Sequence, residues 1–178
     1  MPSIGYRDDY DADAEPIAAA IRARRGGRLL NLDRMLLHSP GIAAGWNALM
    51  GQVRASPAIS PRHRELAICA VARINGADYE FHHHRGPFLD AGGRQAQLDA
   101  LDDVAKAAAN HIVFDEAERA VLALACESSR HVGIDAETMD AVRLHFPEPA
   151  ATFELMMVVA SYNMVSRLLV GLGIEPEN

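Results

Sequence analysis

The stretch Glu65-Leu-Ala-Ile-Cys-Ala-Val-Ala-Arg-Ile-Asn-Gly-Ala-Asp-Tyr-Glu-Phe-His-His-His84 decides the fold of this chain of 178 residues. It is an apolar helical run with one glutamate, followed by an Asn-Gly stop and by a second glutamate four residues before a histidine. Ser60 and Pro61 predict the start of the first helix, because serine caps a helix and proline needs no donor at its first position. Asn75 and Gly76 predict its end.

Outside this stretch, the sequence also reads as helices. Helical spacing of apolar residues predicts helices over 13–25, 42–53, 61–74, 78–91, 115–129, 135–145 and 149–172, with a short apolar segment at 29–37. We expect Asp78 to cap the second helix of the stretch and Pro87 to kink it. No segment alternates as a strand does. The prediction is an all-α fold in a single domain, residues 1–178.

Composition and charge narrow the class of protein. A formal charge of -7 argues against general nucleic-acid binding. The cluster formed by Arg22, Arg24, Arg25 and Arg28 is interpreted as a solvated helix end. No export signal precedes the first helix and no apolar run approaches the length of a membrane span, so we expect a cytoplasmic protein that binds no membrane. Two cysteines make no disulfide framework, and we expect both to be reduced core residues.

The two glutamates and the last histidine of the opening stretch are the candidate catalytic residues. Glu65 falls on an apolar stripe of its helix and should therefore face other protein rather than water. Glu80 and His84 are four residues apart on the next helix, so their side chains can meet. An exposed ion pair is the ordinary interpretation of such spacing, but Phe81 and Phe88 indicate that this helix packs inward. Carboxylates beside an imidazole commonly move protons. We expect the three to converge, with Glu80 orienting His84.

Three consecutive histidines, His82, His83 and His84, raise the possibility of a metal site. Consecutive residues on a helix point about 100° apart, so the three cannot all reach one ion. Glu80 and His84 with Glu65 could supply ligands, but the sequence carries no HExxH or paired-cysteine signature. We therefore expect no metal, and we expect His82 and His83 to face solvent or an interface.

Glu65, the Asn-Gly stop and the motif from Glu80 to His84 together resemble the carboxymuconolactone decarboxylase and alkylhydroperoxidase D superfamily, over roughly residues 40–130. This resemblance implies an oligomeric, all-α, alkylhydroperoxidase D-like helical bundle. The peroxidase branch carries a glutamate and then a Cys-x-x-Cys-x-x-x-His motif. Here Glu65 and His84 match the glutamate and the histidine, whereas the cysteine positions fall on Ala77 and Glu80. The resemblance thus implies the decarboxylase-like branch, with its Glu-x-x-x-His motif and no thiol peroxidase chemistry.

The function that this resemblance implies is a cofactor-free decarboxylation, or a related proton transfer, on a small carboxylic acid or lactone. His84 is the expected general acid, and Glu65 is the expected second proton-transfer or hydrogen-bonding group. Arg64, Arg85 and Arg167 are all candidates for holding the substrate acid, and the sequence does not choose among them. Two alternatives stay open: an alkylhydroperoxidase-type antioxidant protein, and a non-catalytic helical binding or assembly module. We also expect a homo-oligomer, because the helices at 61–74 and 149–172 carry more apolar surface than one domain covers easily.

Overall fold

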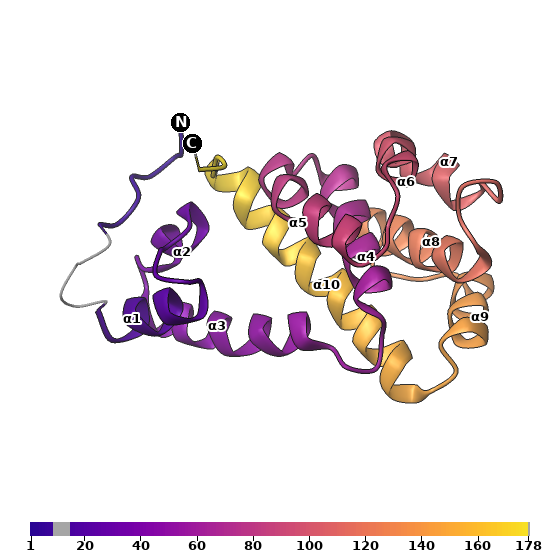
Figure 1. Ribbon diagram of the computed structural model, residues 1–178, viewed down its shortest axis with the longest axis horizontal. Coiled ribbons are helices and arrows are strands. Elements are labelled where there is room, and N and C mark those ends of the chain that lie inside the picture. The colour runs from indigo at the N-terminus through magenta and orange to yellow at the C-terminus, as the bar shows by residue number, and fades with distance from the viewer. Residues whose placement is uncertain (9–14, 178) are drawn as a thin grey trace.

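The computed structural model describes residues 1–8 and 15–177, and these residues form helices and connecting loops without any β-strand (Figure 1). The elements are α1 (Glu15–Arg24), α2 (Asn31–Leu36), α3 (Pro40–Ala55), α4 (Pro61–Asn75), α5 (Asp78–Asp90), α6 (Gln95–Ala100), η1 (Leu101–Asp103), α7 (Val104–Ala108), α8 (Glu116–Arg130), α9 (Ala136–His145) and α10 (Pro149–Leu172). The predicted all-α class is confirmed. The helix expected from residue 13 begins at Glu15 in the described part, and residues 13 and 14 lie outside it.

Helix α4 is the central element, and it packs against α5, α8 and α10. Its start follows the prediction, because the Ser60 hydroxyl accepts a hydrogen bond of 3.1 Å from the His63 amide. Its end does so as well, because Gly76 takes a left-handed conformation with φ of 64°. Every residue from Glu65 to Ala72 is buried, so α4 has no solvent face along this length. Glu65 is therefore held among protein groups, as its place on an apolar stripe predicted.

Helix α5 brings the second half of the opening stretch back against α4 through a two-residue connection, Gly76 and Ala77. Ala77 occupies the cap position, and Asp78 is already the first helical residue, so the prediction that Asp78 caps this helix is wrong. The helix continues through Pro87 to Asp90. Its connection to α4 is short enough that residues near the middle of both helices face each other. This juxtaposition sets up the candidate site.

Helix α10 runs diagonally across the molecule and contacts α3, α4, α5 and α8 (Figure 1). By length and composition alone, α10 could cross a membrane. The sequence-based expectation that no apolar run is this long therefore does not hold for α10. Half of its most apolar window is buried inside the protein, and residues along its whole length, from Ala151 to Leu169, belong to the core. Burial of this kind is typical of the core helix of a globular protein.

Helices α1 and α2 lie at one end of the molecule beside the start of α3, and both chain ends lie near them (Figure 1). The amino group of Met1 pairs with Glu175 at 2.8 Å, and the Ser3 amide donates to the Leu172 carbonyl. Helix α3 leads from this end toward the beginning of α10, and a loop then returns the chain to α4 (Figure 1). The loop and helix that carry Leu30 and Leu32 therefore face α5 and α10 across a cavity.

Candidate functional site

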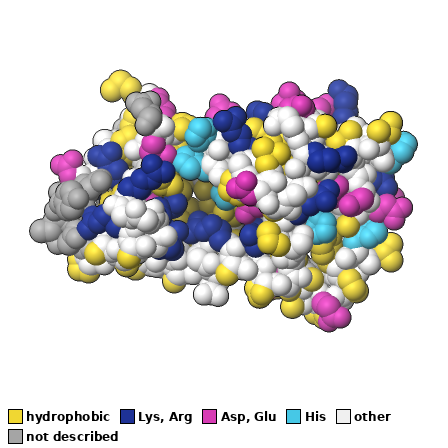
Figure 2. All heavy atoms as spheres, viewed as in Figure 1, with side chains coloured by type: hydrophobic (Ala, Val, Ile, Leu, Met, Phe, Trp, Pro, Cys, Tyr) yellow, Lys and Arg dark blue, Asp and Glu magenta, His cyan; other side chains and the backbone are white. Residues whose placement is uncertain are grey.

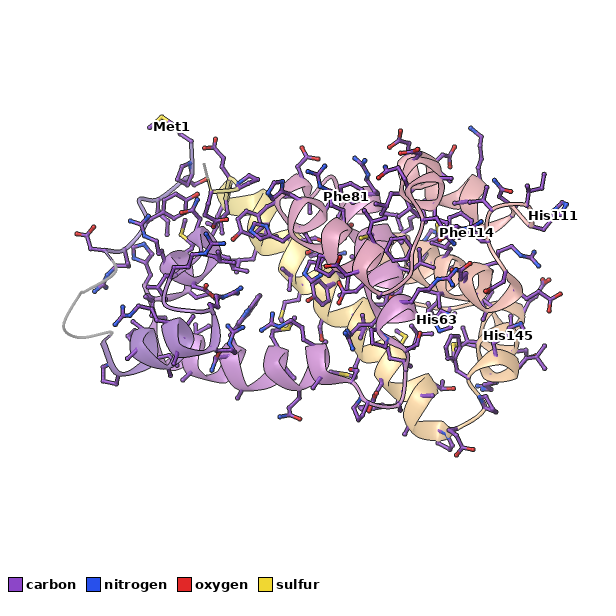
Figure 3. All side chains as sticks on the ribbon, viewed as in Figure 1. Met1, His63, Phe81, His111, Phe114 and His145 are labelled. Carbon is purple, nitrogen blue, oxygen red and sulfur yellow. The ribbon has the colours of Figure 1, made fainter. Side chains whose placement is uncertain are left out.

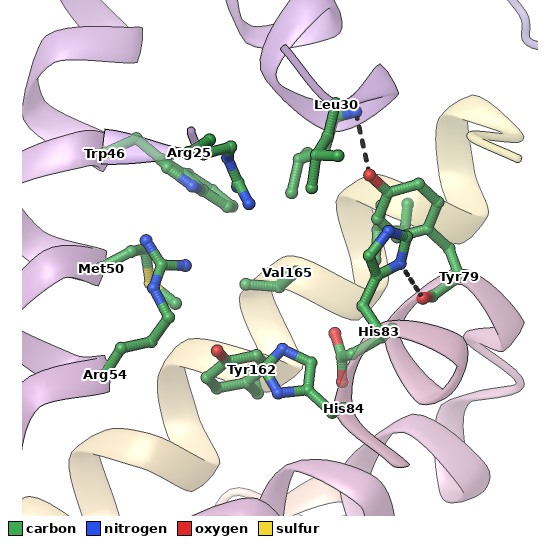
Figure 4. Close-up of a pocket in the computed structure, with 13 residues that line it drawn as sticks. Arg25, Leu30, Trp46, Met50, Arg54, Tyr79, His83, His84, Tyr162 and Val165 are labelled. Carbon is green, nitrogen blue, oxygen red and sulfur yellow. Dashed lines mark hydrogen bonds between the residues drawn. The ribbon is translucent and has the colours of Figure 1, made fainter. Parts of the chain in front are cut away.

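A cavity of about 170 Å³ lies where α3, α5, α10 and the segment around Leu30 meet (Figure 4). Its lining residues come from five parts of the chain and are Arg25, Leu30, Leu32, Trp46, Met50, Arg54, Tyr79, Glu80, His83, His84, Tyr162, Val165 and Leu169. Figure 2 shows it as a hollow with basic side chains along its rim. A cavity of about 150 Å³ holds one benzene molecule, so this space suits a single small ring or a short acid.

His84, which lines this cavity, is paired with Glu65 of α4 behind it. Nδ1 of His84 lies 2.7 Å from Oε2 of Glu65, and both side chains are largely buried. The other oxygen of Glu65 faces Nε of Arg64 at 3.3 Å. With Nδ1 donating to Glu65, Nε2 of His84 is the nitrogen that remains for a ligand in the cavity. The ring is held further by an edge contact with Tyr162, with the two centroids 5.0 Å apart.

Glu80 shares the cavity with His84, but it is not the partner that orients the imidazole. Oε1 of Glu80 accepts a hydrogen bond of 3.0 Å from the Ser166 hydroxyl, and Oε2 has no hydrogen-bond partner among the described residues. The prediction that Glu80 orients His84 is therefore wrong, because Glu65 on the neighbouring helix fills that place. Glu80 is 2% exposed, and this burial raises its pKa well above the ordinary value, with the Ser166 hydrogen bond opposing only part of the effect.

Arginines from α3 and from the end of α1 face the same cavity from the opposite side (Figure 4). Arg25 is already engaged, because Asp33 binds it through two contacts of 2.6 and 3.0 Å. Arg54 forms no ion pair with any carboxylate of the described residues. Burial lowers the pKa of Arg24, and the nearby charges of Arg25 and Arg54 lower it further. Positive charge is thus concentrated on this wall, where it would attract an anion.

Each of the two facing walls carries an aromatic side chain, Trp46 beside the arginines and Tyr162 against His84 (Figure 4). Trp46, Met50 and Arg54 lie one helical turn apart on α3 and line the cavity together. The Tyr162 hydroxyl is buried and makes no hydrogen bond of ordinary geometry within the described structure. Burial raises the pKa of Tyr162, although the neighbouring guanidinium of Arg54 opposes this, so the phenol stays neutral. A flat ligand could therefore rest among these rings with its charge toward Arg54.

The remaining edge of the cavity is closed by Glu177 near the C-terminus. Its carboxylate accepts hydrogen bonds from the Tyr79 hydroxyl at 3.0 Å and from the Asn31 amide at 2.5 Å, and it pairs with Nε2 of His83 at 2.9 Å. His83 also contacts the Tyr79 carbonyl through Nδ1 (Figure 4). His82 is exposed as expected, whereas His83 is half-buried and lines the cavity.

Other potentially reactive groups lie away from the cavity. Cys69 and Cys126 are both buried and unpaired, and burial raises the pKa of each thiol. His63, His111 and His145 lie toward the opposite end of the molecule (Figure 3). Within residues 1–8 and 15–177, no group of three histidine, cysteine or acidic side chains gathers that could hold a metal ion.

None of the arginines proposed from the sequence lines this cavity. Arg64 contacts Glu65, Arg167 donates to Asn163, and Arg85 lines a separate pocket beside Phe81. Arg54 is the cavity arginine that lacks an ion-pair partner among the described residues, and it was not predicted as a site residue. The sequence does indicate its helix face, because Trp46, Met50 and Arg54 recur every four residues and must lie on the same side of their helix.

The residues of this site lie in a segment that matches a known protein family. Residues 40–127, about half of the chain, match the model of the carboxymuconolactone decarboxylase family. This segment contains Glu65, Glu80 and His84. The chain belongs to the carboxymuconolactone decarboxylase and alkylhydroperoxidase D-like superfamily. No match is found among curated protein sequences.

Solved structures show the same fold at low sequence identity. An uncharacterized peroxidase-related protein from Silicibacter sp. TM1040 superposes with a TM-score of 0.80 at 16% identity, covering 99% of this chain and 92% of that one. A single-residue variant of the debrominase Bmp8, in complex with 2,3,4-tribromopyrrole, gives 0.74 at 19% identity, covering 93% and 86%. A putative antioxidant defence protein AhpD from Agrobacterium tumefaciens gives 0.70 at 19% identity, covering 81% and 96%. At such identities the likeness is one of fold.

Proposed function

We propose that this protein is a cofactor-free proton-transfer enzyme of the carboxymuconolactone decarboxylase type, acting on a small carboxylic acid or lactone. The observation that carries the proposal is the hydrogen bond of 2.7 Å between His84 and Glu65 at a cavity whose other wall presents Arg54. An imidazole held by a buried carboxylate is a suitable general acid. A guanidinium that no described carboxylate pairs with is a suitable anchor for the carboxylate of a substrate.

In the proposed reaction, the substrate carries a carbonyl group β to the departing carboxylate. The carbon–carbon bond to that carboxylate breaks, carbon dioxide leaves, and the bonding electrons move onto the carbonyl oxygen as an enolate. The enolate carbon then takes a proton from Nε2 of His84, and solvent returns a proton to the imidazole. Glu65 stabilises the imidazolium through Nδ1, while Arg54 fixes a carboxylate of the substrate and so aligns the reacting carbon.

The thiol-dependent alternatives receive no support from the position of the cysteines. Neither Cys69 nor Cys126 lines the cavity, and burial raises the pKa of both thiols, which disfavours the reactive thiolate. The position four residues before His84 holds Glu80 rather than a cysteine. A neighbour that carries antioxidant or debrominase chemistry therefore does not transfer that chemistry to these residues.

The proposal also includes the setting in which the enzyme works. We propose a cytoplasmic homo-oligomer with a small-molecule substrate and with no nucleic-acid or membrane partner. Support for self-association comes from apolar side chains that stay exposed on two long helices, namely Ile42 and Leu49 on α3 and Phe153, Met164 and Val170 on α10. Such side chains on outer helical faces commonly mark contacts between copies of a chain.

Binding of a simple carboxylate tests the anion-binding part of the proposal. Trp46 is the only tryptophan and lines the cavity, so its fluorescence should report the binding of benzoate. Arg54→Met should weaken this binding by about 10-fold to 100-fold, the usual effect of losing a charge-assisted hydrogen bond. Arg143→Met is the matched control, because Arg143 is an exposed arginine on α9. Equal benzoate affinity in the Arg54 variant and the wild type would contradict the proposed anchor.

A further inference from the structure

Glu80 is a buried carboxyl group. One of its oxygens has a hydrogen-bond donor, and the other has no hydrogen-bond partner among the described residues. The residue is 2% exposed, and the Ser166 hydroxyl donates to Oε1 at 3.0 Å. Oε2 contacts no hydrogen-bonding group of the described residues, yet Glu80 lines the cavity. A buried polar atom without a partner is rare in folded proteins and needs an explanation.

The charges around Glu80 do not suit an ionised carboxylate. No arginine, lysine or histidine of the described residues forms an ion pair with it, and His84 pairs with Glu65 instead. Two neighbouring titratable groups, Cys69 and Tyr162, stay neutral because burial raises their pKa values. A buried carboxylate with one hydroxyl donor and no cation is strongly disfavoured. Burial accordingly raises the pKa of Glu80 and favours the protonated acid.

The position of that proton follows from the hydrogen bonds. Oε1 accepts from Ser166 and therefore serves as the carbonyl oxygen of the acid. The hydroxyl belongs on Oε2, and no acceptor of the described protein faces it. An acceptor atom must then come from a molecule in the cavity. A neutral carboxylic acid kept protonated by an apolar site is an effective donor to an oxyanion.

We propose that Glu80 is a further catalytic residue, which keeps its proton and donates a hydrogen bond from Oε2 to the enolate oxygen of the reacting acid. This inference rests on the proposed function, because it assumes a carboxylate seated toward Arg54 and a reacting carbon near His84. The proton stays on Glu80 throughout, and the proton that forms the new carbon–hydrogen bond comes from His84. This role suits the substrate class of the proposed function, because the carbanion of such an acid is delocalised onto an oxygen.

A fluorinated phenol provides the probe. The compound 3-fluoro-4-hydroxybenzoate carries a carboxylate for Arg54 and a phenol that mimics the enolate, and its fluorine NMR shift reports ionisation of the phenol. The control ligand, 4-fluorobenzoate, lacks the hydroxyl. We expect the wild type to bind the phenolate form in preference to the neutral phenol. Glu80→Met should lose about 10-fold to 100-fold of the phenolate affinity and leave 4-fluorobenzoate binding within about twofold of the wild type.

Glu80→Gln separates a neutral donor from a charged carboxylate. The amide can still accept from Ser166 through its oxygen and donate through its nitrogen, so this variant should retain most of the phenolate preference. An equal loss in Glu80→Gln and Glu80→Met, or no loss in Glu80→Met, would overturn the inference. Should the Met variant fail to fold, wild type that binds the probe without lowering the pH at which its phenol ionises would overturn it as well. Wild type that binds neither ligand would instead contradict the anion-binding cavity of the proposed function.

Discussion

The substitution Glu80→Gln should make the protein more stable at neutral pH and change how its stability depends on pH. In the folded state, burial raises the pKa of Glu80 well above 4.5, the ordinary value that applies to the unfolded chain. The group therefore contributes stability that is fully present below pH 4.5 and is lost as the pH rises toward its folded-state pKa. Glutamine cannot ionise in either state, and its amide keeps the contact with Ser166.

The size of the effect follows from proton linkage. While the unfolded chain has ionised Glu80 and the folded protein has not, the wild type loses about 1.4 kcal/mol of unfolding free energy per pH unit relative to the variant. The stability difference between the variant and the wild type should therefore grow by up to about 1.4 kcal/mol for each pH unit above pH 4.5. For a protein of this size, each such step corresponds to a growth in the Tm difference of roughly 3–6 °C.

Urea unfolding of the two proteins at pH 5, 6 and 7 measures this difference directly. Glu137→Gln is the matched control, because it removes an exposed carboxylate on α9, and its stability difference from the wild type should not change with pH. A Glu80→Gln difference that stays constant from pH 5 to pH 7 would refute the reasoning. It would mean that Glu80 ionises in the folded protein as readily as in the unfolded chain.

Three further expectations concern other parts of the molecule. Any hydroperoxide turnover should survive the double substitution Cys69→Ala and Cys126→Ala, and its loss in the double variant would restore the thiol chemistry rejected above. Light scattering at micromolar concentration should give an oligomer mass, because apolar side chains are exposed on α3 and α10; a monomer mass would reject self-association. Burial alone would raise the pKa of Glu177, but hydrogen bonds from Asn31 and Tyr79 lower that pKa overall. The contacts of Glu177 should therefore stabilise the fold above pH 4.5, and this stabilisation should be lost as the pH falls. Glu177→Gln should lower the Tm mainly at neutral pH, and a Tm equal to that of the wild type there would contradict this.

The helices that position the site were predictable because their end signals are local. Ser60, Pro61 and Gly76 act within one turn of the chain, and the apolar pattern of α4 required burial on all sides. Helices α6 and α7 were missed, although Leu98, Leu101, Val104 and Ala107 recur every three residues and are all buried. Each of these helices is too short to stand out by pattern, and contacts with the rest of the fold hold them. One such contact joins the buried Gln97 of α6 to Glu118 of α8.

The sequence predicted that Glu65, Glu80 and His84 belong to the site, but not that His84 pairs with Glu65. Spacing of four residues places Glu80 near His84 on one helix, which is why the sequence favoured that pair. The crossing of α4 and α5 instead brings Glu65 to His84, 19 residues away in the chain. The arginine wall depends on how α3 lies across α5 and α10, and no local signal encodes that. For the same reason, Arg54 could be placed on a helix face from the sequence but not in a cavity.

Decarboxylation in deuterated water, followed by proton NMR, tests the central proposal most directly. A panel of small β-keto acids and carboxylated lactones is incubated with wild type, Glu65→Gln and His84→Gln protein, and the product is examined at the carbon that lost carbon dioxide. Wild type should release product with one deuterium there, and both variants should turn over at least about 100-fold more slowly while still binding benzoate. A wild-type rate in His84→Gln, or no turnover of the whole panel by wild type, would contradict a proton transfer by the His84 and Glu65 pair.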